Sequence, residues 1–346
     1  MSELSPLIDE AKIEAFLDSQ NLGAGPITAT RIGDGGGSNF TFLIERGRDR
    51  YVLRRPPRPP LPPSAHDMIR EAALQDAIRD GGFKRLVELL AVCEDESVLG
   101  VPFYVTRWLD GHVVTAQLPP GLEAEGARRK LGEDLVDTLV EIHAADVSTP
   151  KLAAFARPGS YAERQLRRFA QLWELNKTRE LPAVDEVGAT LARELPAPVP
   201  PTVVHGDYRL GNMMVVRDEP TRIEAVLDWE MGAIGDPRAD VGYLLATYSE
   251  PGGAQNPLGS SPVTAELGFP KRAELAARYA ERSGRDVEPL AWFEALALWK
   301  AAVFCEAIYG RYIRGELGSE DTLAARFELG VPLLAETALE RLSNGA

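Results

Sequence analysis

The spacing of apolar residues changes character about a third of the way along this chain of 346 residues. Up to residue 110 the apolar residues form short runs rich in β-branched and aromatic side chains, a pattern typical of strands. Such runs lie at residues 27–32, 39–45, 50–55, 89–94 and 102–108. Short segments that contain glycine join the first three runs, as hairpin connections do. The pattern therefore predicts a five-stranded antiparallel sheet.

A helix is predicted between the third and fourth of these strands. Residues 56–63 hold six prolines in eight positions, which predicts an extended connection. The helix should follow, beginning within residues 64–67 as a variant of the capping box and ending at Gly81 and Gly82. A proline-rich run can also be a ligand for a proline-recognising module, but a loop between strand and helix accounts for this one.

After residue 110 the apolar residues recur with helical spacing. The segments with this spacing are residues 127–145, 161–178, 185–195, 271–283, 289–314 and 321–342. Only residues 203–228 interrupt them, with loop and strand character. At roughly 100–200 residues per domain, the length suits two lobes. We therefore expect an α+β fold with a small antiparallel-sheet lobe at residues 1–110 and a larger, mainly helical lobe at residues 111–346.

Composition narrows the class of protein. The chain has 38 Lys and Arg residues against 52 Asp and Glu residues, so its formal net charge is −14. A body this acidic is a poor partner for nucleic acid, which is bound largely through cationic contacts to phosphate. The amino terminus shows no signal-peptide pattern, and the most apolar long segment, residues 290–309, contains three charged side chains. We therefore expect a soluble, cytoplasmic protein that neither enters a membrane nor binds nucleic acid.

Three polar residues converge in the segment that interrupts the helices. Residues 213–216 and 223–227 predict two strands of a hairpin, so Asn212 and Asp228 should meet at its open end. Asp207 lies one loop away. Carboxylate and amide oxygens suit a hard cation such as Mg²⁺, and a further carboxylate can orient a hydroxyl group and accept its proton. These are the chemical demands of phosphoryl transfer.

Motifs in the same region resemble those of the aminoglycoside phosphotransferase family. They are H-G-D-x4-N at residues 205–212, D-W-E at 228–230 and G-D-P-x-x-D at 235–240. Residues 51–57 and 298–302 are most similar to the kinase-like branch associated with acyl-CoA dehydrogenases. The resemblance implies a bilobal protein-kinase-like fold. It also implies an enzyme that uses ATP and Mg²⁺ to phosphorylate a hydroxyl group of a small molecule.

The resemblance implies a role for each matching residue. Asp207 matches the catalytic base, while Asn212 and Asp228 match the Mg²⁺ ligands. The residues expected at ATP come from the glycine-rich loop, the third strand, the first-lobe helix and the connection between the lobes: Gly35, Gly36, Gly37, Ser38, Asn39, Val52, Arg54, Glu71, Arg107, Trp108 and Leu109. The residues expected to support the site structurally are His205, Asp236 and Asp240.

One position departs from the family pattern. The third strand carries Arg54 where the family has a lysine, and no lysine lies between Lys12 and Lys84. Residues two apart on a strand share a face, so Val52 should pack on adenine while Arg54 reaches the phosphates and Glu71. Arginine stays charged and can bind phosphate bidentately. The exchange should therefore affect phosphate geometry more than the class of reaction.

Two other classes of protein stay open. The missing lysine favours a pseudokinase, a nucleotide-binding or scaffolding protein with little catalysis, whereas the three polar residues argue against it. A protein kinase is disfavoured because no activation segment is evident. The predicted helix at residues 161–178 carries Arg164, Arg167 and Arg168, which form either a solvated basic face or a wall for an anionic acyl or phosphate group. Neither the acceptor nor the oligomeric state follows from the sequence.

Overall fold

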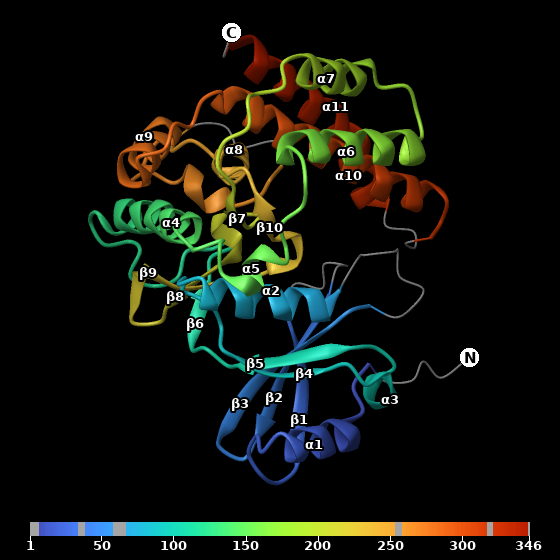
Figure 1. Ribbon diagram of the computed structural model, residues 1–346, viewed down its shortest axis with the longest axis vertical. Helices are drawn as coiled ribbons and strands as arrows, with labels where there is room; N and C mark the ends of the chain where they lie inside the picture. The colour runs from blue at the N-terminus through green and yellow to red at the C-terminus, as the bar shows by residue number, and fades with distance from the viewer. Residues whose placement is uncertain (1–6, 34–38, 58–66, 253–257, 317–320, 345–346) are drawn as a thin grey trace.

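The computed structural model describes residues 7–33, 39–57, 67–252, 258–316 and 321–344. Figure 1 shows two lobes arranged along the long axis, with a sheet-rich part at one end and a larger helical part at the other. This is the bilobal α+β architecture that the sequence predicted.

The smaller lobe is built on a five-stranded antiparallel sheet. Its strands are β1 (Ile27–Ile32), β2 (Phe40–Arg46), β3 (Asp49–Arg55), β4 (Leu89–Cys93) and β5 (Phe103–Arg107), in the order β1-β2-β3-β5-β4. Alternate residues such as Leu53, Phe103 and Val105 are fully buried on one face. The sequence therefore predicted each of these strands to within one residue at either end.

Three helices complete the described part of this lobe. Helix α1 (Glu10–Ser19), which the sequence had not predicted, packs Ile13 and Leu17 against the buried face of the sheet. Helix α2 (Met68–Asp80) begins after the predicted segment 64–67, because Asp67 is its N-cap and accepts the Arg70 N–H at 2.9 Å. Helix α3 (Glu96–Leu99) is a single short turn. Residues 58–66, which hold most of the proline-rich run, lie outside the described residues.

The larger lobe is mainly helical. Its helices are α4 (Ala127–His143), α5 (Pro150–Ala153), α6 (Tyr161–Asn176), α7 (Pro182–Arg193), α8 (Arg238–Thr247), α9 (Arg272–Ser283), α10 (Leu290–Ile313) and α11 (Asp321–Asn344). Its strands are β6 (Gly111–Val113), β7 (Thr202–Val204), β8 (Met213–Val216), β9 (Glu219–Val226) and β10 (Ala233–Gly235), which form two small antiparallel sheets. Short 3₁₀ turns at Leu210–Asn212, Trp229–Met231 and Pro262–Ala265 complete the lobe.

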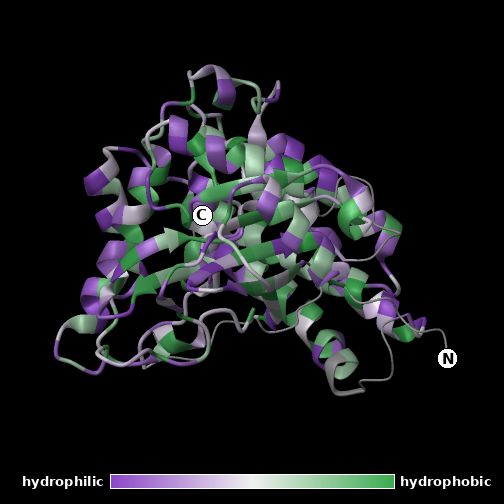
Figure 2. Ribbon diagram, turned by 90° about the horizontal axis from the view of Figure 1, so that it is seen from below, coloured by the Kyte–Doolittle hydropathy of each residue, from purple (hydrophilic) through white to green (hydrophobic). Residues whose placement is uncertain are grey.

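Two hydrophobic cores hold the larger lobe together. One surrounds α4 and the β8–β9 hairpin and reaches α2 of the smaller lobe, while the other joins α6, α7, α10 and α11. Polar and apolar residues alternate along the outer helices in Figure 2, as expected of helices with one face toward a core. Helix α8 was not predicted from the sequence. Most of its residues are buried, so it lacks a one-sided apolar stripe. Within the described part of the chain, no helix combines the length and apolar character needed to cross a membrane.

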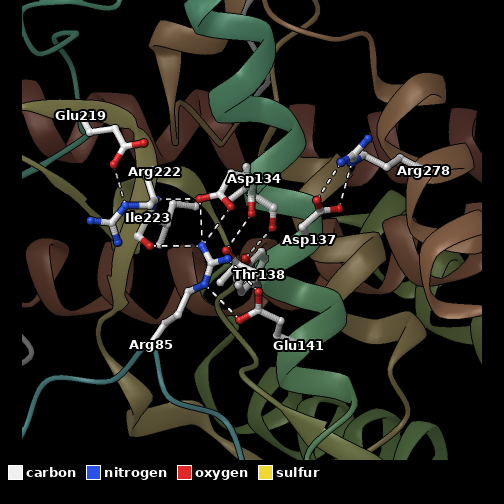
Figure 3. Close-up of polar contacts among 11 residues, drawn as sticks. Arg85, Asp134, Asp137, Thr138, Glu141, Glu219, Arg222, Ile223 and Arg278 are labelled. Carbon is white, nitrogen blue, oxygen red and sulfur yellow. Dashed lines mark hydrogen bonds and ion pairs between the residues drawn. The ribbon is translucent and has the colours of Figure 1, made fainter.

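Arg85 joins the two lobes at a point between α2 and β4. Its guanidinium donates to Asp134 at 2.9 Å and to Glu141 at 2.7 Å, both on α4, and to the Ile223 carbonyl at 3.1 Å (Figure 3). Its own carbonyl accepts the Val226 N–H at 2.9 Å. Because Ile223 and Val226 belong to β9, these bonds fix the smaller lobe against the strand that leads into the candidate site.

Candidate active site

The β8–β9 hairpin brings Asn212 and Asp228 together as the sequence predicted. Met213 pairs with Val226 in the antiparallel register, and the Leu227 N–H donates to the Asn212 carbonyl at 2.9 Å. Asn212 and Asp228 therefore flank the last pair of the ladder at the open end of the hairpin. Asp228 has a φ of 65°, a left-handed conformation that turns the chain sharply into the 3₁₀ turn that follows.

Asp207 joins this pair from the loop after β7. The Asn212 side-chain amide donates to Asp207 Oδ2 at 2.8 Å and to the Asp207 carbonyl at 2.8 Å. Arg209 Nε lies 3.3 Å from Asp207 Oδ1. Both carboxylate oxygens are thus held in place while the side chain keeps 23% of its exposure. Sequence reasoning missed Arg209, although its position inside the H-G-D-x4-N motif could have indicated it.

Asp240, at the start of α8, anchors the loop that carries Asp207. It is fully buried and accepts the backbone N–H groups of His205 at 2.7 Å and Gly206 at 2.8 Å. His143, whose other ring nitrogen contacts the Tyr279 hydroxyl at 2.6 Å, lies 3.3 Å from the same carboxylate. These are the backbone bonds expected of Asp240, and they fix the loop from behind.

The other two supporting residues are also held in networks. His205 is buried and its Nε2 lies 2.9 Å from the Leu227 carbonyl, so it ties the loop to the end of β9. Asp236 binds the Arg238 guanidinium at 2.7 Å and accepts the Arg238 N–H at 3.0 Å. Gly206 has a φ of 85°, and a Cβ there would lie 2.9 Å from the Met231 carbonyl oxygen, so the turn requires glycine.

Arg54 lies where charges from both lobes meet. Its Nη2 pairs with Asp228, its Nε lies 3.8 Å from Glu71, and Glu230 is 4.0 Å away. Burial alone would lower the pKa of Arg54, but the neighbouring Tyr104, Glu71 and Asp228 raise it above its ordinary value. The guanidinium therefore stays charged and bridges the two lobes.

Glu71 and Glu230 flank this arginine. Glu71 is almost fully buried, accepts the Tyr104 hydroxyl at 3.0 Å, and has a pKa raised chiefly by burial. Burial and the charge of Asp228 raise the pKa of Glu230 to about 7. Asn39 donates to Glu230 at 2.8 Å, which links the end of the glycine-rich loop to the larger lobe.

The remaining residues expected at ATP fall into three groups. Gly35, Gly36, Gly37 and Ser38 lie outside the described residues. Val52 is half-buried and lies two positions before Arg54, on the same face of β3. Between the lobes, the Arg107 N–H donates to the Glu88 carbonyl at 2.9 Å, and the Trp108 N–H donates to the Arg50 carbonyl at 3.3 Å. These two N–H groups thus have partners inside the lobe, and Leu109 follows directly after them.

The donor set suits Mg²⁺, which prefers oxygen ligands and commonly uses one or two carboxylates together with substrate phosphates. The Asn212 NH₂ group donates two hydrogen bonds to Asp207, and the amide oxygen of Asn212 takes part in neither of them. Asp228 keeps 27% of its exposure beside it. Across the described ranges, no cluster of three or more His, Cys, Asp or Glu could hold a metal by itself. The described residues therefore fit an ion completed by phosphate rather than one enclosed by protein.

The three arginines expected to form a basic face on α6 lie in three different surroundings. Arg164 donates to the carbonyls of Arg157 at 3.2 Å and Pro158 at 3.1 Å, so it closes the loop before the helix. Arg167 lies on the outer surface, in a shallow depression of α6. Arg168 alone lies near enough to Lys300 on α10 for its charge to lower the pKa of that lysine.

Two further residues near Asp207 were missed by sequence reasoning. Tyr243 on α8 is partly buried, and burial raises its pKa well above 10, with the charge and a side-chain hydrogen bond of Asp207 contributing. Burial lowers the pKa of Lys300, and the charges of Asp240 and Asp207 act in the opposite direction. No local motif marks either residue, because only the packing of helices brings each of them into the neighbourhood of Asp207.

The two lobes have the architecture of the kinase-like phosphotransferase fold. The chain belongs to the phosphotransferase enzyme family, whose family model matches residues 28–293. The family predicted from the motifs is therefore confirmed.

Individual relatives refine this assignment. The chain is 31% identical over 340 residues to acyl-CoA dehydrogenase family member 11 of Mus musculus, covering 96% of this chain and 43% of the mouse protein. The chain thus spans less than half the length of that curated relative, and the branch predicted from the sequence is confirmed. A crystal structure of a candidate aminoglycoside phosphotransferase from Ralstonia eutropha matches with a TM-score of 0.75 and 28% identity, covering 96% of this chain and 98% of that one.

A more distant structure shares the fold alone. Spectinomycin phosphotransferase, solved with ADP and spectinomycin, matches with a TM-score of 0.62 and 14% identity over 96% of this chain and 99% of that one. The bilobal kinase-like fold is therefore common to this chain and to a protein with bound nucleotide.

Proposed function

We propose that the chain is an ATP- and Mg²⁺-dependent phosphotransferase that moves the γ-phosphoryl group to a hydroxyl group of a small molecule. The observation that carries the proposal is the meeting of Asp207, Asn212 and Asp228 beside Arg54. Residues 1–110 would form the nucleotide-binding lobe and residues 111–346 the catalytic and acceptor-binding lobe.

Asp207 would orient the acceptor hydroxyl and accept its proton. The bonds from Asn212 and Arg209 fix both of its oxygens, so the carboxylate does not need to reorganise when the hydroxyl arrives. Asp240 and His205 would hold the loop in that position. The entropic cost of orienting the Asp207 carboxylate is therefore incurred when the chain folds, before the substrate binds.

Asn212 and Asp228 would hold Mg²⁺, which on binding neutralises charge that builds up on the transferring phosphoryl group. Arg54 would bind phosphate oxygens in place of the family's lysine, and Glu71 would keep the guanidinium oriented. Val52 and the segment Arg107, Trp108 and Leu109 would contact adenine, and Asn39 would contact ATP.

A pseudokinase is the second candidate, and the ion pair between Arg54 and Asp228 is the observation that favours it. If Arg54 stayed paired with Asp228, it would compete with Mg²⁺ for the Asp228 carboxylate. The exposure of Asp228 and the pre-formed bonds of Asp207 favour the enzyme, because a scaffold has no need of an oriented carboxylate.

Calorimetric titration with Mg·ATP and a screen of hydroxylated metabolites and antibiotics for ADP release would test the proposal. Once an acceptor is found, Asp207→Asn should lower kcat by roughly 10²- to 10⁴-fold while Mg·ATP affinity changes little. Asp218→Asn, in the exposed turn after β8, is the matched control and should leave kcat unchanged. Full turnover by Asp207→Asn would show that Asp207 is not the catalytic base. Failure of the wild-type protein to bind Mg·ATP would refute the phosphotransferase itself.

A further inference from the structure

Arg209 is the arginine beside the proposed base, in the loop between β7 and β8. Its Nε lies 3.3 Å from Asp207 Oδ1, and its side chain keeps 28% of its exposure. Among the described residues, neither of its terminal Nη groups has a hydrogen-bond partner. An arginine carries most of its N–H donors on these two groups. The guanidinium therefore has donors to offer to a ligand at the site.

The guanidinium is held against the backbone of its own loop. A Cβ added to Gly211 would lie 2.1 Å from Arg209 Nη1 and 3.2 Å from Arg209 Cζ. Atoms this close clash, so a side chain at position 211 would displace the guanidinium. Gly211 belongs to the 3₁₀ turn that ends at Asn212. Glycine at this position therefore lets Arg209 lie against the turn that carries the proposed Mg²⁺ ligand.

The charge of Arg209 is less engaged than that of Arg54. The Arg54 guanidinium faces Asp228 with Nη2 and Glu71 with Nε. Arg209 faces one carboxylate, that of Asp207, and has no other ion pair among the described residues. Phosphoryl transfer spreads negative charge over the oxygens of the moving group while the attacking oxygen approaches in line. An attacking hydroxyl oriented by Asp207 would bring that charge close to Arg209.

We propose that Arg209 is a catalytic residue whose guanidinium binds the transferring phosphoryl group while its Nε keeps Asp207 oriented. This proposal rests on the proposed function and adds a second arginine to it. In the transfer, the bond between the γ-phosphorus and the bridging oxygen of ATP breaks, a bond from the acceptor oxygen to phosphorus forms, and the hydroxyl proton passes to Asp207. Arg209 gains and loses no proton, and its fixed charge stabilises the phosphoryl oxygens.

The test is calorimetric titration of the full chain with Mg·ADP, with and without aluminium fluoride, an anion that imitates the transferring phosphoryl group. Aluminium fluoride should tighten the binding of Mg·ADP to the wild-type protein. Arg209→Met, which keeps an apolar stem, should lose about 10²- to 10³-fold of that tightening and bind Mg·ADP alone as wild type does. Arg222→Met is the control, because Arg222 is an exposed arginine that pairs with Glu219 on β9, and it should respond like wild type.

Two further variants separate contact with the phosphoryl group from indirect effects. In Gly211→Ala the three atoms nearest to the new Cβ all belong to the Arg209 guanidinium, the end of a flexible side chain. Urea unfolding should therefore stay close to wild type, while the tightening by aluminium fluoride falls as in Arg209→Met. Direct contact also requires Arg209→Met to lower the tightening when Asp207→Asn is already present.

The outcomes distinguish this inference from the proposed function. Full tightening in Arg209→Met or Gly211→Ala, or a wild-type affinity for Mg·ADP that does not respond to aluminium fluoride, would overturn the inference. So would an effect of Arg209→Met that disappears in the Asp207→Asn background, because Arg209 would then act only through Asp207. A wild-type chain that binds neither Mg·ATP nor Mg·ADP refutes the phosphotransferase proposal instead.

Discussion

Replacing Arg54 by methionine should destabilise the protein by about 3 kcal/mol. The guanidinium faces three carboxylates, those of Glu71, Asp228 and Glu230, and methionine keeps the packing of its stem while it removes the charge. Glu71 is 1% exposed, so without Arg54 its carboxylate would stay buried, and among the described residues the Tyr104 hydroxyl is the one side-chain donor left to it. The three acidic groups would then repel one another with no cation between them.

The expected magnitude follows from how deeply each partner is buried. Removing one member of a fully buried ion pair costs about 3–5 kcal/mol. The Arg54 side chain is 15% exposed and Asp228 is 27% exposed, so water screens part of the repulsion and the lower end applies. Arg54→Lys keeps the charge but offers one ammonium group where the guanidinium faces Glu71 and Asp228 with different nitrogens. We expect it to cost about 1 kcal/mol, the net worth of one such bond.

Urea unfolding followed by circular dichroism and tryptophan fluorescence would measure these differences. Arg48→Met, in the exposed turn between β2 and β3, is the matched control and should shift the midpoint little. If Arg54→Met unfolds at the same urea concentration as this control, the carboxylates do not depend on Arg54 and the reasoning is wrong. If Arg54→Lys equals Arg54→Met, charge alone is not what holds the cluster.

Three further outcomes follow from the structure. Arg85→Ala should lower the free energy of unfolding by about 2 kcal/mol, because the bonds from α4 and β9 to the smaller lobe are lost, and urea unfolding indistinguishable from wild type would contradict this. Asp240→Ala should destabilise by about 3 kcal/mol, since two buried backbone N–H groups lose their acceptor, and an unchanged thermal midpoint would show that water replaces it. Lys300→Met should be more stable than wild type by about 3 kcal/mol near pH 7, because a pKa lowered from 10.5 to about 8 penalises the protonated folded state. Because the pKa of Lys300 is lowered by folding, this stability difference should shrink as the pH rises from about 8 to 10.5. A difference that stays constant in urea unfolding over this range would refute the lowered pKa.

The parts of the fold that depend on local pattern follow from the sequence. Each strand of the smaller lobe was predicted because alternate residues such as Leu53 and Val105 must face the core, and a period of two is visible without a partner strand. The hairpin was predictable for the same reason, and its register brings Asn212 next to Asp228. Both depend on residues close together in the chain.

Helices α1 and α8 show where local pattern was insufficient. Helix α1 depends on docking of Ile13 and Leu17 onto the sheet, and α8 is enclosed by neighbours that come from elsewhere in the chain. Packing rather than propensity stabilises such helices, so a one-sided stripe is either too short or missing.

The sequence by itself determined which groups are available for chemistry, namely Asp207, Asn212 and Asp228 on one short segment, together with an arginine on the third strand. Only the tertiary structure decided what surrounds them. Arg54 meets Asp228 across 174 positions, and Lys300 comes near Asp207 only because α10 packs against α6 and α8. The physical reason is that charges act through space: a carboxylate responds to every cation near it in space, whatever the distance along the chain.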